Sequence, residues 1–266
     1  MKGTLFSGKG GKPAWLSRLT GGACAAVFLL ALWLIAYEAA GNDYLIPSLG
    51  ASLRETGRIL SAPGFWRAFG GTFSRTLSAF FLSFAAALVC SVVAYLLPAF
   101  GRFLSPLISV VRSLPTMAVI LIILVWTTPS TAPVIVAFLA LFPMLCAGMG
   151  AALAAVPPEL VEMSRIYRVP VQKRIFCLYL PCAAPYMLRE GAAALSFSLK
   201  LVVSAEVLAN TYQSLGGLLQ EAKLYVEMPR LFALTLTVIV VGFLLEGAGA
   251  LIARLAKGRV SWKSKR

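Results

Sequence analysis

Residues 113–158 read SLPTMAVILIILVWTTPSTAPVIVAFLALFPMLCAGMGAALAAVPP, and none of these 46 residues is Asp, Glu, Lys or Arg. A helix that crosses a bilayer needs roughly 20 apolar residues, each rising about 1.5 Å. The stretch is therefore long enough for two crossings, and the segment TTPSTAP at 127–133 predicts the turn between them. A second uncharged stretch, 76–101, has room for another crossing. We predict an all-α membrane protein with several spans.

The composition of the chain supports this class. Of its 266 residues 59% are hydrophobic and only 13% are charged, whereas soluble domains carry about 25% charged residues. The net charge of +14 would suggest nucleic acid in a soluble protein, but in a membrane protein Lys and Arg gather in cytoplasmic loops. We therefore expect no nucleic-acid partner. The chain has no His, and its cysteines include no C-x-x-C pair, so neither a metal site nor a cofactor is expected on it.

Extending the pattern along the chain predicts six spans, at about 23–40, 74–97, 104–126, 132–153, 183–209 and 230–253. We interpret the first as a retained anchor, because Glu38 occupies the place where a signal peptide has small residues for cleavage. Residues 41–71 are expected to be a mixed-charge, partly helical segment, and 210–229 a loop. Basic tails are expected at 1–22 and 254–266.

Charge asymmetry predicts the orientation. Six spans place both termini, a turn at 98–102 and the loop 154–181 on one side, where they contribute fifteen Lys and Arg against six on the other side. The positive-inside rule then predicts that the termini and the 154–181 loop face the cytoplasm, in a multi-pass protein of the cytoplasmic membrane.

Residues 3–10 almost match the phosphate-binding pattern G-x-x-x-x-G-K-[S/T]. The segment lacks the final hydroxyl residue that would hold Mg²⁺, and no strand precedes it. We therefore expect a flexible basic tail here, and any ATP-driven mechanism would need an ATPase on another chain.

The polar part of the 154–181 loop, residues 157–168, reads PPELVEMSRIYR. The two prolines suit the start of a helix, acidic residues follow near that start, and basic residues come near the end, as the helix dipole favours. Pro170 should end this helix of about three turns. Its modest apolar stripe consists of Leu160, Ser164 and Tyr167, with Met163 beside it. From the pattern alone, it is either an interfacial helix against lipid headgroups or a docking element for a cytosolic partner.

This passage resembles the EAA motif of permease subunits of binding-protein-dependent ABC importers, E-A-A-x-x-x-G followed after nine residues by I-x-L-P. Glu162-Met163-Ser164 corresponds to E-A-A, Arg168 to the glycine, and Leu178-Tyr179-Leu180-Pro181 to I-x-L-P. Other segments are similar to the nitrate/sulfonate/taurine-type branch, and the likeness extends over about 45–255. These segments are Thr72-Phe73-Ser74-Arg75 (T-L-x-R), Arg112-Ser113-Leu114-Pro115 (R-P-x-P), Val203-Ser204-Ala205-Glu206 (V-V-A-E) and, more loosely, Leu215-Gly216-Gly217-Leu218 (G-L-G).

The chain departs from the motif at two positions. Met163 is larger than the motif's alanine, and Arg168 replaces the glycine. Glycine ends a helix in the left-handed conformation at low cost, and arginine does not. We therefore expect either that the helix runs on to Val169 or that Arg168 makes a charged contact of its own.

The resemblance implies a fold like that of type I ABC importer permeases and a non-catalytic transport subunit for a small, anionic or vitamin-like solute. It implies cytosolic ATPase subunits that hold ATP and Mg²⁺, an extracytoplasmic solute-binding protein, a second permease copy and membrane lipid as partners. The implied ATPase-docking residues are Glu159, Glu162, Met163, Ser164, Arg165, Tyr167, Arg168 and Pro181.

Charges inside the spans are candidates for the pathway, because they are expensive in a bilayer and usually face a cavity or one another. We expect Lys200 and Arg112 to line the pathway and to favour an anion. Glu206 is expected near the outer mouth, where it either meets the solute-binding protein or pairs with Arg75, and Glu246 is the expected partner of Arg112. The alternative function is a stand-alone secondary transporter or channel, although the scarcity of intramembrane carboxylates argues against proton coupling.

Overall fold

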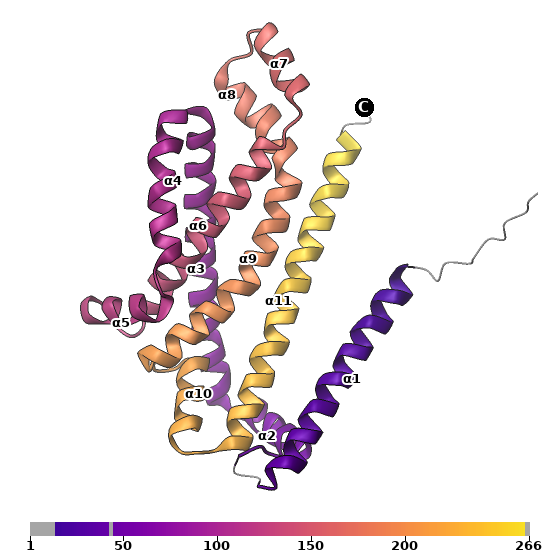
Figure 1. Ribbon diagram of the computed structural model, residues 1–266, viewed down its shortest axis with the longest axis vertical. Coiled ribbons are helices and arrows are strands. Elements are labelled where there is room, and N and C mark those ends of the chain that lie inside the picture. Colours follow the sequence, from indigo (N-terminus) through magenta and orange to yellow (C-terminus); the bar gives the residue numbers. More distant parts are fainter. Residues whose placement is uncertain (1–13, 43–44, 264–266) are drawn as a thin grey trace, which may run out of the picture.

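The computed structural model describes residues 14–42 and 45–263, and every regular element among them is a helix. Residues 3–10, with the phosphate-loop-like segment, and the end of the basic tail at 264–266 lie outside the described residues. The elements (Figure 1) are α1 (Ala14–Ala40), α2 (Leu49–Ser61), α3 (Pro63–Leu96), α4 (Pro98–Ser113), α5 (Thr116–Trp126), α6 (Ala132–Ala154), α7 (Pro158–Ile166), α8 (Val171–Arg174), a π-helix (Ile175–Tyr179), α9 (Leu180–Ala209), α10 (Leu215–Leu224) and α11 (Met228–Lys263).

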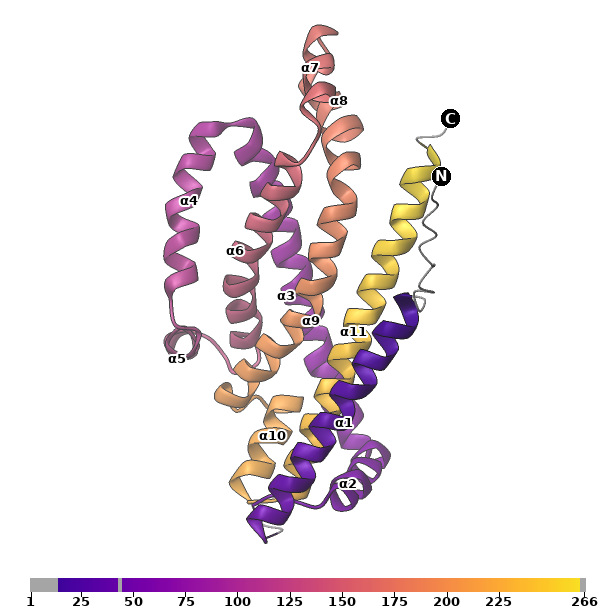
Figure 2. The ribbon, with the colours of Figure 1, turned by 45° about the vertical axis from the view of Figure 1, so that its right-hand side comes forward.

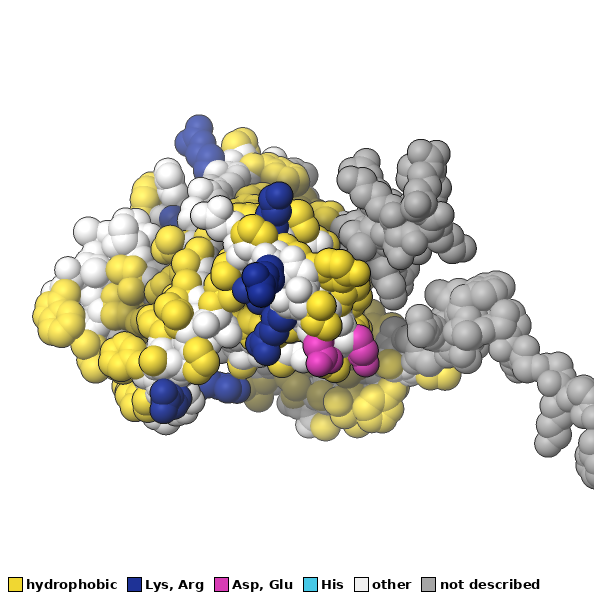
Figure 3. Space-filling model, turned by 90° about the horizontal axis from the view of Figure 1, so that it is seen from above, with side chains coloured by type: hydrophobic (Ala, Val, Ile, Leu, Met, Phe, Trp, Pro, Cys, Tyr) yellow, Lys and Arg dark blue, Asp and Glu magenta, His cyan; other side chains and the backbone are white. Residues whose placement is uncertain are grey.

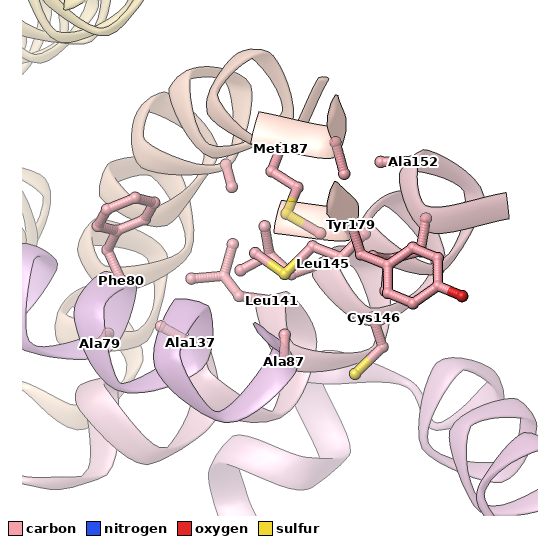
Figure 4. Close-up of a cluster of buried hydrophobic side chains, with 14 of the residues drawn as sticks. Ala79, Phe80, Ala87, Ala137, Leu141, Leu145, Cys146, Ala152, Tyr179 and Met187 are labelled. Carbon is pink, nitrogen blue, oxygen red and sulfur yellow. The ribbon is translucent and has the colours of Figure 1, made fainter. Parts of the chain in front are cut away.

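The core lies where α3, α6 and α9 pack together (Figures 1 and 2). Small side chains from α3, Ala79 and Ala87, meet the buried Leu141 and Leu145 of α6 and Met187 of α9 (Figure 4). Small residues let membrane helices approach closely, which strengthens van der Waals packing between them. The three helices therefore form the rigid centre, with α4 on one side and α11 on the other.

Four helical segments are long and apolar enough to cross a membrane. They are Pro63–Leu96, Ala132–Ala154, Val171–Ala209 and Met228–Ala253. The all-α, multi-pass class is confirmed, and four of the six predicted spans lie within these segments. The expected first span falls in α1, where the described apolar part, Val27–Ala40, is shorter. Helix α3 begins at Pro63, in its first helical turn, before the start predicted for the second span.

The segment predicted as one span at 104–126 is broken into two helices. The chain bends by 95° between α4 and α5, where Leu114 is extended (φ −70°, ψ 129°) before Pro115. A residue that precedes proline is pushed out of the helical region, and proline itself offers no backbone N–H. The 11 residues of α5 span only about 16 Å, roughly half of the hydrocarbon core. Helix α4 begins at Pro98, at the start of the predicted turn at 98–102.

The expected loop at 210–229 contains α10. Its first turn is capped by Ser214, whose side-chain oxygen accepts a hydrogen bond of 2.8 Å from the Gly217 N–H. A capping serine supplies a partner to one of the unpaired amides of a helix start. The segment is thus a short helix between two long ones rather than an irregular connection.

The elements define two ends of the molecule. The α7 end holds α7, α8, the α3–α4 connection and the last turns of α11, and the α10 end holds α2 and α10 (Figures 1 and 2). The 98–102 segment, the 154–181 loop and the carboxyl-terminal helix therefore share one end, as the six-span topology requires. Basic side chains extend across the α7 end, with a small acidic patch at one edge (Figure 3). That this end faces the cytoplasm remains a prediction from the charge count.

Candidate functional site

Helix α7 stands at the tip of the α7 end (Figure 2). It is shorter than predicted, since it ends at Ile166. One face is anchored: Val161 packs against the core, and the buried Ser164 hydroxyl donates a hydrogen bond of 2.6 Å to the Val161 carbonyl. Ser164 therefore points toward its own chain, whereas the resemblance places it among the docking residues.

The opposite face of α7 is apolar and exposed. Met163, Ile166 and Tyr167 are 49%, 74% and 76% exposed, and their i, i+3, i+4 spacing makes them neighbours on one helix face. The charged docking candidates Glu159, Glu162, Arg165 and Arg168 are exposed around them. Pro181 is partly buried in the first turn of α9 and is not part of this surface. Sequence reasoning missed Ile166, although its position three residues after Met163 was the available signal.

Arg168 ends α7 in the left-handed conformation, with φ at 48°. Its N–H donates to the Arg165 carbonyl, and the Val169 N–H donates to the Ser164 carbonyl, each at 3.0 Å. These two bonds are the Schellman pattern, which usually has glycine at this position. The expectation that the helix runs on to Val169 is therefore wrong. Arg168 adopts the backbone of the motif glycine, and no ion pair joins its side chain to another described residue.

The chain leaves α7 through a short non-helical connection at 167–170 and is helical again from Val171. Pro170 precedes α8, the π-helix follows without a break, and α9 continues from it. Tyr179 at the end of the π-helix is buried and packs edge-on against Tyr95 of α3, with ring centroids 5.1 Å apart. Single π-turns inside helices occur often at functional sites. This path connects the exposed face of α7 to the span that carries Lys200 and Glu206.

A hydrogen-bonded cluster at the α10 end is centred on Glu206, which is fully buried. One carboxylate oxygen accepts from Arg75 Nε at 2.7 Å, and the other accepts from Thr72 Oγ1 at 2.8 Å and from the Gly216 N–H at 3.1 Å. The Leu215 N–H donates to Thr72 Oγ1 at 2.8 Å. The predicted pair of Glu206 with Arg75 is confirmed, and three of the quoted segments, 72–75, 203–206 and 215–218, meet here.

Glycine is required where α10 enters this cluster. A Cβ atom at Gly216 would collide with the Cβ of Glu206 and lie 2.7 Å from the Val203 carbonyl oxygen. A Cβ at Gly71 would lie 2.6 Å from the Gln213 carbonyl oxygen. The backbones of α3, α9 and the α9–α10 connection therefore touch directly, which explains the glycine in the 215–218 segment.

The two predicted pathway cations lie apart. Lys200 is exposed on a face of α9 that also exposes Phe197 and Ser204. Arg112 is exposed at the end of α4, on the wall of a cavity of about 420 Å³ between α3, α4 and α6 that also carries Ser91, Ser105 and Ser109. The predicted pair of Arg112 with Glu246 is not formed in the described residues, because Glu246 lines a separate cavity with Arg189. The described residues contain no group of three or more Cys, Asp or Glu placed to hold a metal ion.

Comparison with known proteins places these features in a family. Residues 90–258 match the family profile of the binding-protein-dependent transport system inner membrane component. Among solved structures, an inward-facing MetNI methionine ABC transporter matches with a TM-score of 0.62 and 20% identity, over 74% of this chain and 99% of that chain. An amino acid ABC transporter crystallised with histidines matches with a TM-score of 0.57 and 16% identity, over 71% and 90%. No match was found among curated proteins.

The profile covers more than half of the chain, and the solved structures share its helical fold. The permease subunits of this family are not catalytic, and the ATPase resides on a separate subunit. The chain therefore belongs to the family of binding-protein-dependent transport system inner membrane components, as a permease component of an ABC importer.

Proposed function

We propose that this chain forms the pathway by which a small solute moves inward, driven by a separate cytosolic ATPase that docks on α7. The observation that carries the proposal is the exposed apolar face of Met163, Ile166 and Tyr167 at the tip of the molecule. An apolar cluster with charged neighbours is typical of the centre and rim of a protein interface.

The position of α7 favours a docking element over an interfacial helix. In both ribbon views α7 lies farther along the long axis than the α3–α4 connection (Figures 1 and 2). An interfacial helix buries its apolar face about 5–10 Å into the headgroup region. The face of α7 extends past that connection, so a protein partner is the better match for it.

The helical run from α8 through the π-helix into α9, joined to α7 by the short connection at 167–170, would couple α7 to the core. A displacement of α7 by a closing pair of ATPase subunits would be transmitted along α9, because α9 packs into the core with α3 and α6. The far end of α9 carries the Glu206 cluster. We infer that this cluster holds the α10 end as one unit while the α7 end moves.

Lys200 and Arg112 support an anionic or vitamin-like solute. Both are exposed cations within predicted spans, and charges in a span face a water-filled pathway or a partner. The nitrate/sulfonate/taurine-type segments agree with this class of solute. An extracytoplasmic binding protein would deliver the solute at the α10 end.

A second permease copy completes the proposal. No residue of α4 is buried within this chain, and apolar side chains such as Phe103, Leu107 and Val110 are exposed on it. One chain also provides only one α7, whereas the proposed closure involves two ATPase subunits. A homodimer would satisfy both observations.

Reconstitution tests the function. Uptake in vesicles should require this chain, its ATPase, ATP and the binding protein together. Transport by vesicles that contain this chain alone would overturn the importer mechanism and establish the alternative, a stand-alone secondary transporter or channel.

Co-purification tests the docking surface. Replacing both Ile166 and Tyr167 by alanine should abolish co-purification of the ATPase. Tyr212→Ala, which removes a similarly exposed ring at the opposite end, is the matched control and should retain the ATPase. Retention by the double variant would contradict docking on α7.

A further inference from the structure

A groove between α9 and α11 contains two charged side chains of opposite sign. Arg189 and Tyr186 line it from α9, and Glu246 lines it from α11. Its volume is about 630 Å³, within the range of about 300–1,000 Å³ that small-molecule sites occupy. Neither charge belongs to the cavity beside Arg112 or to the Glu206 cluster.

Small residues keep this groove open. The two helices touch at Ala192 and Gly249, where a Cβ on the glycine would lie 2.9 Å from the Ala192 Cβ, and Ser196 Oγ donates to the Gly242 carbonyl at 3.2 Å. Beside this tight contact the small side chains of Ala193 and Ala250 line the walls. The space between the charged side chains is therefore maintained by close helix packing.

The two charges lack partners within the described part of the chain. No hydrogen bond or ion pair there involves the side chain of Arg189 or of Glu246. No position three or four residues away on either helix carries the opposite charge. Charges in a span are expensive unless they are paired, so a groove with two unpaired opposite charges is suited to a ligand that satisfies both.

The depth of the groove indicates which ligands can reach it. Glu246 lies eight residues before Arg254, the next charged residue along the chain, which is about 12 Å along the helix axis. The groove is therefore in the half of the membrane nearer the α7 end, within reach of both lipid headgroups and solutes from that side.

We propose that this groove binds a small zwitterionic group, with its phosphate or carboxylate on Arg189 and its ammonium on Glu246. A guanidinium can hold a phosphate or carboxylate through two parallel hydrogen bonds, and Glu246 accepts hydrogen bonds from the ammonium. A plain anion would leave Glu246 unpaired, and a plain cation would leave Arg189 unpaired.

Two sources present this chemistry: the headgroup of phosphatidylethanolamine in the bilayer, and a free zwitterion in solution. Phosphocholine is the discriminating control for both, because its quaternary ammonium has the same charge and no N–H donor. The proposal does not depend on transport, since binding can be measured on the full chain without the ATPase.

Equilibrium binding to the full chain in detergent tests the site, with short-chain phosphatidylethanolamine and O-phosphoethanolamine as probes. At least one probe should bind about tenfold more tightly than its phosphocholine counterpart, since a hydrogen bond to a charged group contributes about that factor or more. Arg189→Gln and Glu246→Gln should each weaken binding by about tenfold or more on the same basis. Lys223→Gln, which removes an exposed charge at the α10 end, is the control and should leave the affinity for both probes unchanged.

The arms of the experiment distinguish the outcomes. Binding of phosphatidylethanolamine alone identifies a lipid site, and binding of O-phosphoethanolamine identifies a site for a soluble zwitterion. If neither binds, or if both glutamine variants bind as the parent does, the proposal is overturned. Ala250→Leu fills the groove without changing its charge, so it tests the site even if a glutamine variant does not fold. Binding of the probes that survives this change also overturns the proposal.

Discussion

Replacing Glu206 by alanine should destabilise the chain far more than removing an exposed carboxylate. Glu206 is 0% exposed, and the Arg75 side chain that it pairs with is 16% exposed. The change leaves the guanidinium without its counter-charge and removes the acceptor from Thr72 Oγ1 and the Gly216 N–H. Removing one partner of a buried ion pair costs about 3–5 kcal/mol.

An exposed ion pair of the same chain is the matched control. Glu227 bonds to Arg230 at 2.9 Å, but its side chain is 48% exposed, and Arg230 also contacts Glu221 at 3.4 Å. Exposed ion pairs of this kind contribute about 0–1 kcal/mol to the free energy of unfolding. Glu227→Ala should therefore have little effect on the free energy of unfolding.

Thermal unfolding of the purified full chain in detergent measures the difference. For a domain of about this size, 1 kcal/mol shifts the midpoint by about 2–4 °C, so Glu206→Ala should lower it by about 6–20 °C and Glu227→Ala by at most about 4 °C. Glu206→Gln should fall between them, because the amide keeps an acceptor but loses the charge.

A double-mutant cycle tests the pairing itself. Adding Arg75→Ala to Glu206→Ala removes the unpaired cation. The double variant should therefore lose less free energy of unfolding than the sum of the losses in the two single variants. Additive losses, or a Glu206→Ala midpoint equal to that of Glu227→Ala, would refute the buried network as the source of the stability.

Three further predictions concern other parts of the chain. Arg168→Gly should stabilise α7 by about 1 kcal/mol, because glycine adopts the left-handed conformation without strain. Amide hydrogen exchange in α7 should therefore slow, and co-purification of the ATPase should be unchanged. Exchange that does not slow would contradict the backbone role of this position, and loss of co-purification would show that the ATPase recognises the charge. Gly216→Ala should destabilise by about 1–3 kcal/mol through overpacking, measured by thermal unfolding against Gly247→Ala, where a Cβ meets nothing within 4 Å. Lys200→Gln and Arg112→Gln should each reduce uptake of an anionic solute in reconstituted vesicles, and undiminished transport in both would show that neither cation serves the pathway.

The helical type of the elements followed from the uncharged runs, but the division of one predicted span into α4 and α5 did not. Counting apolar residues treats 104–126 as one span, because Leu114 and Pro115 are as uncharged as their neighbours. Their conformation turns the chain by 95°. Helix α10 was missed for a different reason. Its two glycines suggest a loop, and only the close approach of Gly216 to α9 and of Gly217 to the Thr211 carbonyl shows why glycine stands in this helix.

The candidate sites were predictable to different degrees. The charged residues of α7 were expected to be accessible, and the structure exposes them. The conformation of Arg168 was not readable, because arginine disfavours a positive φ. The pairing of Glu206 with Arg75 was anticipated as one of two possibilities. The role of Thr72 depends on contacts with segments more than a hundred residues away, and the role of Gly216 depends on how the chain folds back between α9 and α10; single-sequence patterns carry no information on either arrangement.

The π-helix at Ile175–Tyr179 also sets the angular phase between the two segments that it joins. Each residue of an α-helix advances the chain by about 100° around its axis, and a π-turn accommodates one extra residue within an otherwise α-helical path. Removing one residue from this segment would rotate α8, and α7 with it, by about 100° relative to α9. The apolar face of α7 would then point in another direction, although every one of its residues was unchanged. The length of this five-residue segment is therefore as much a part of the docking surface as the side chains that line it.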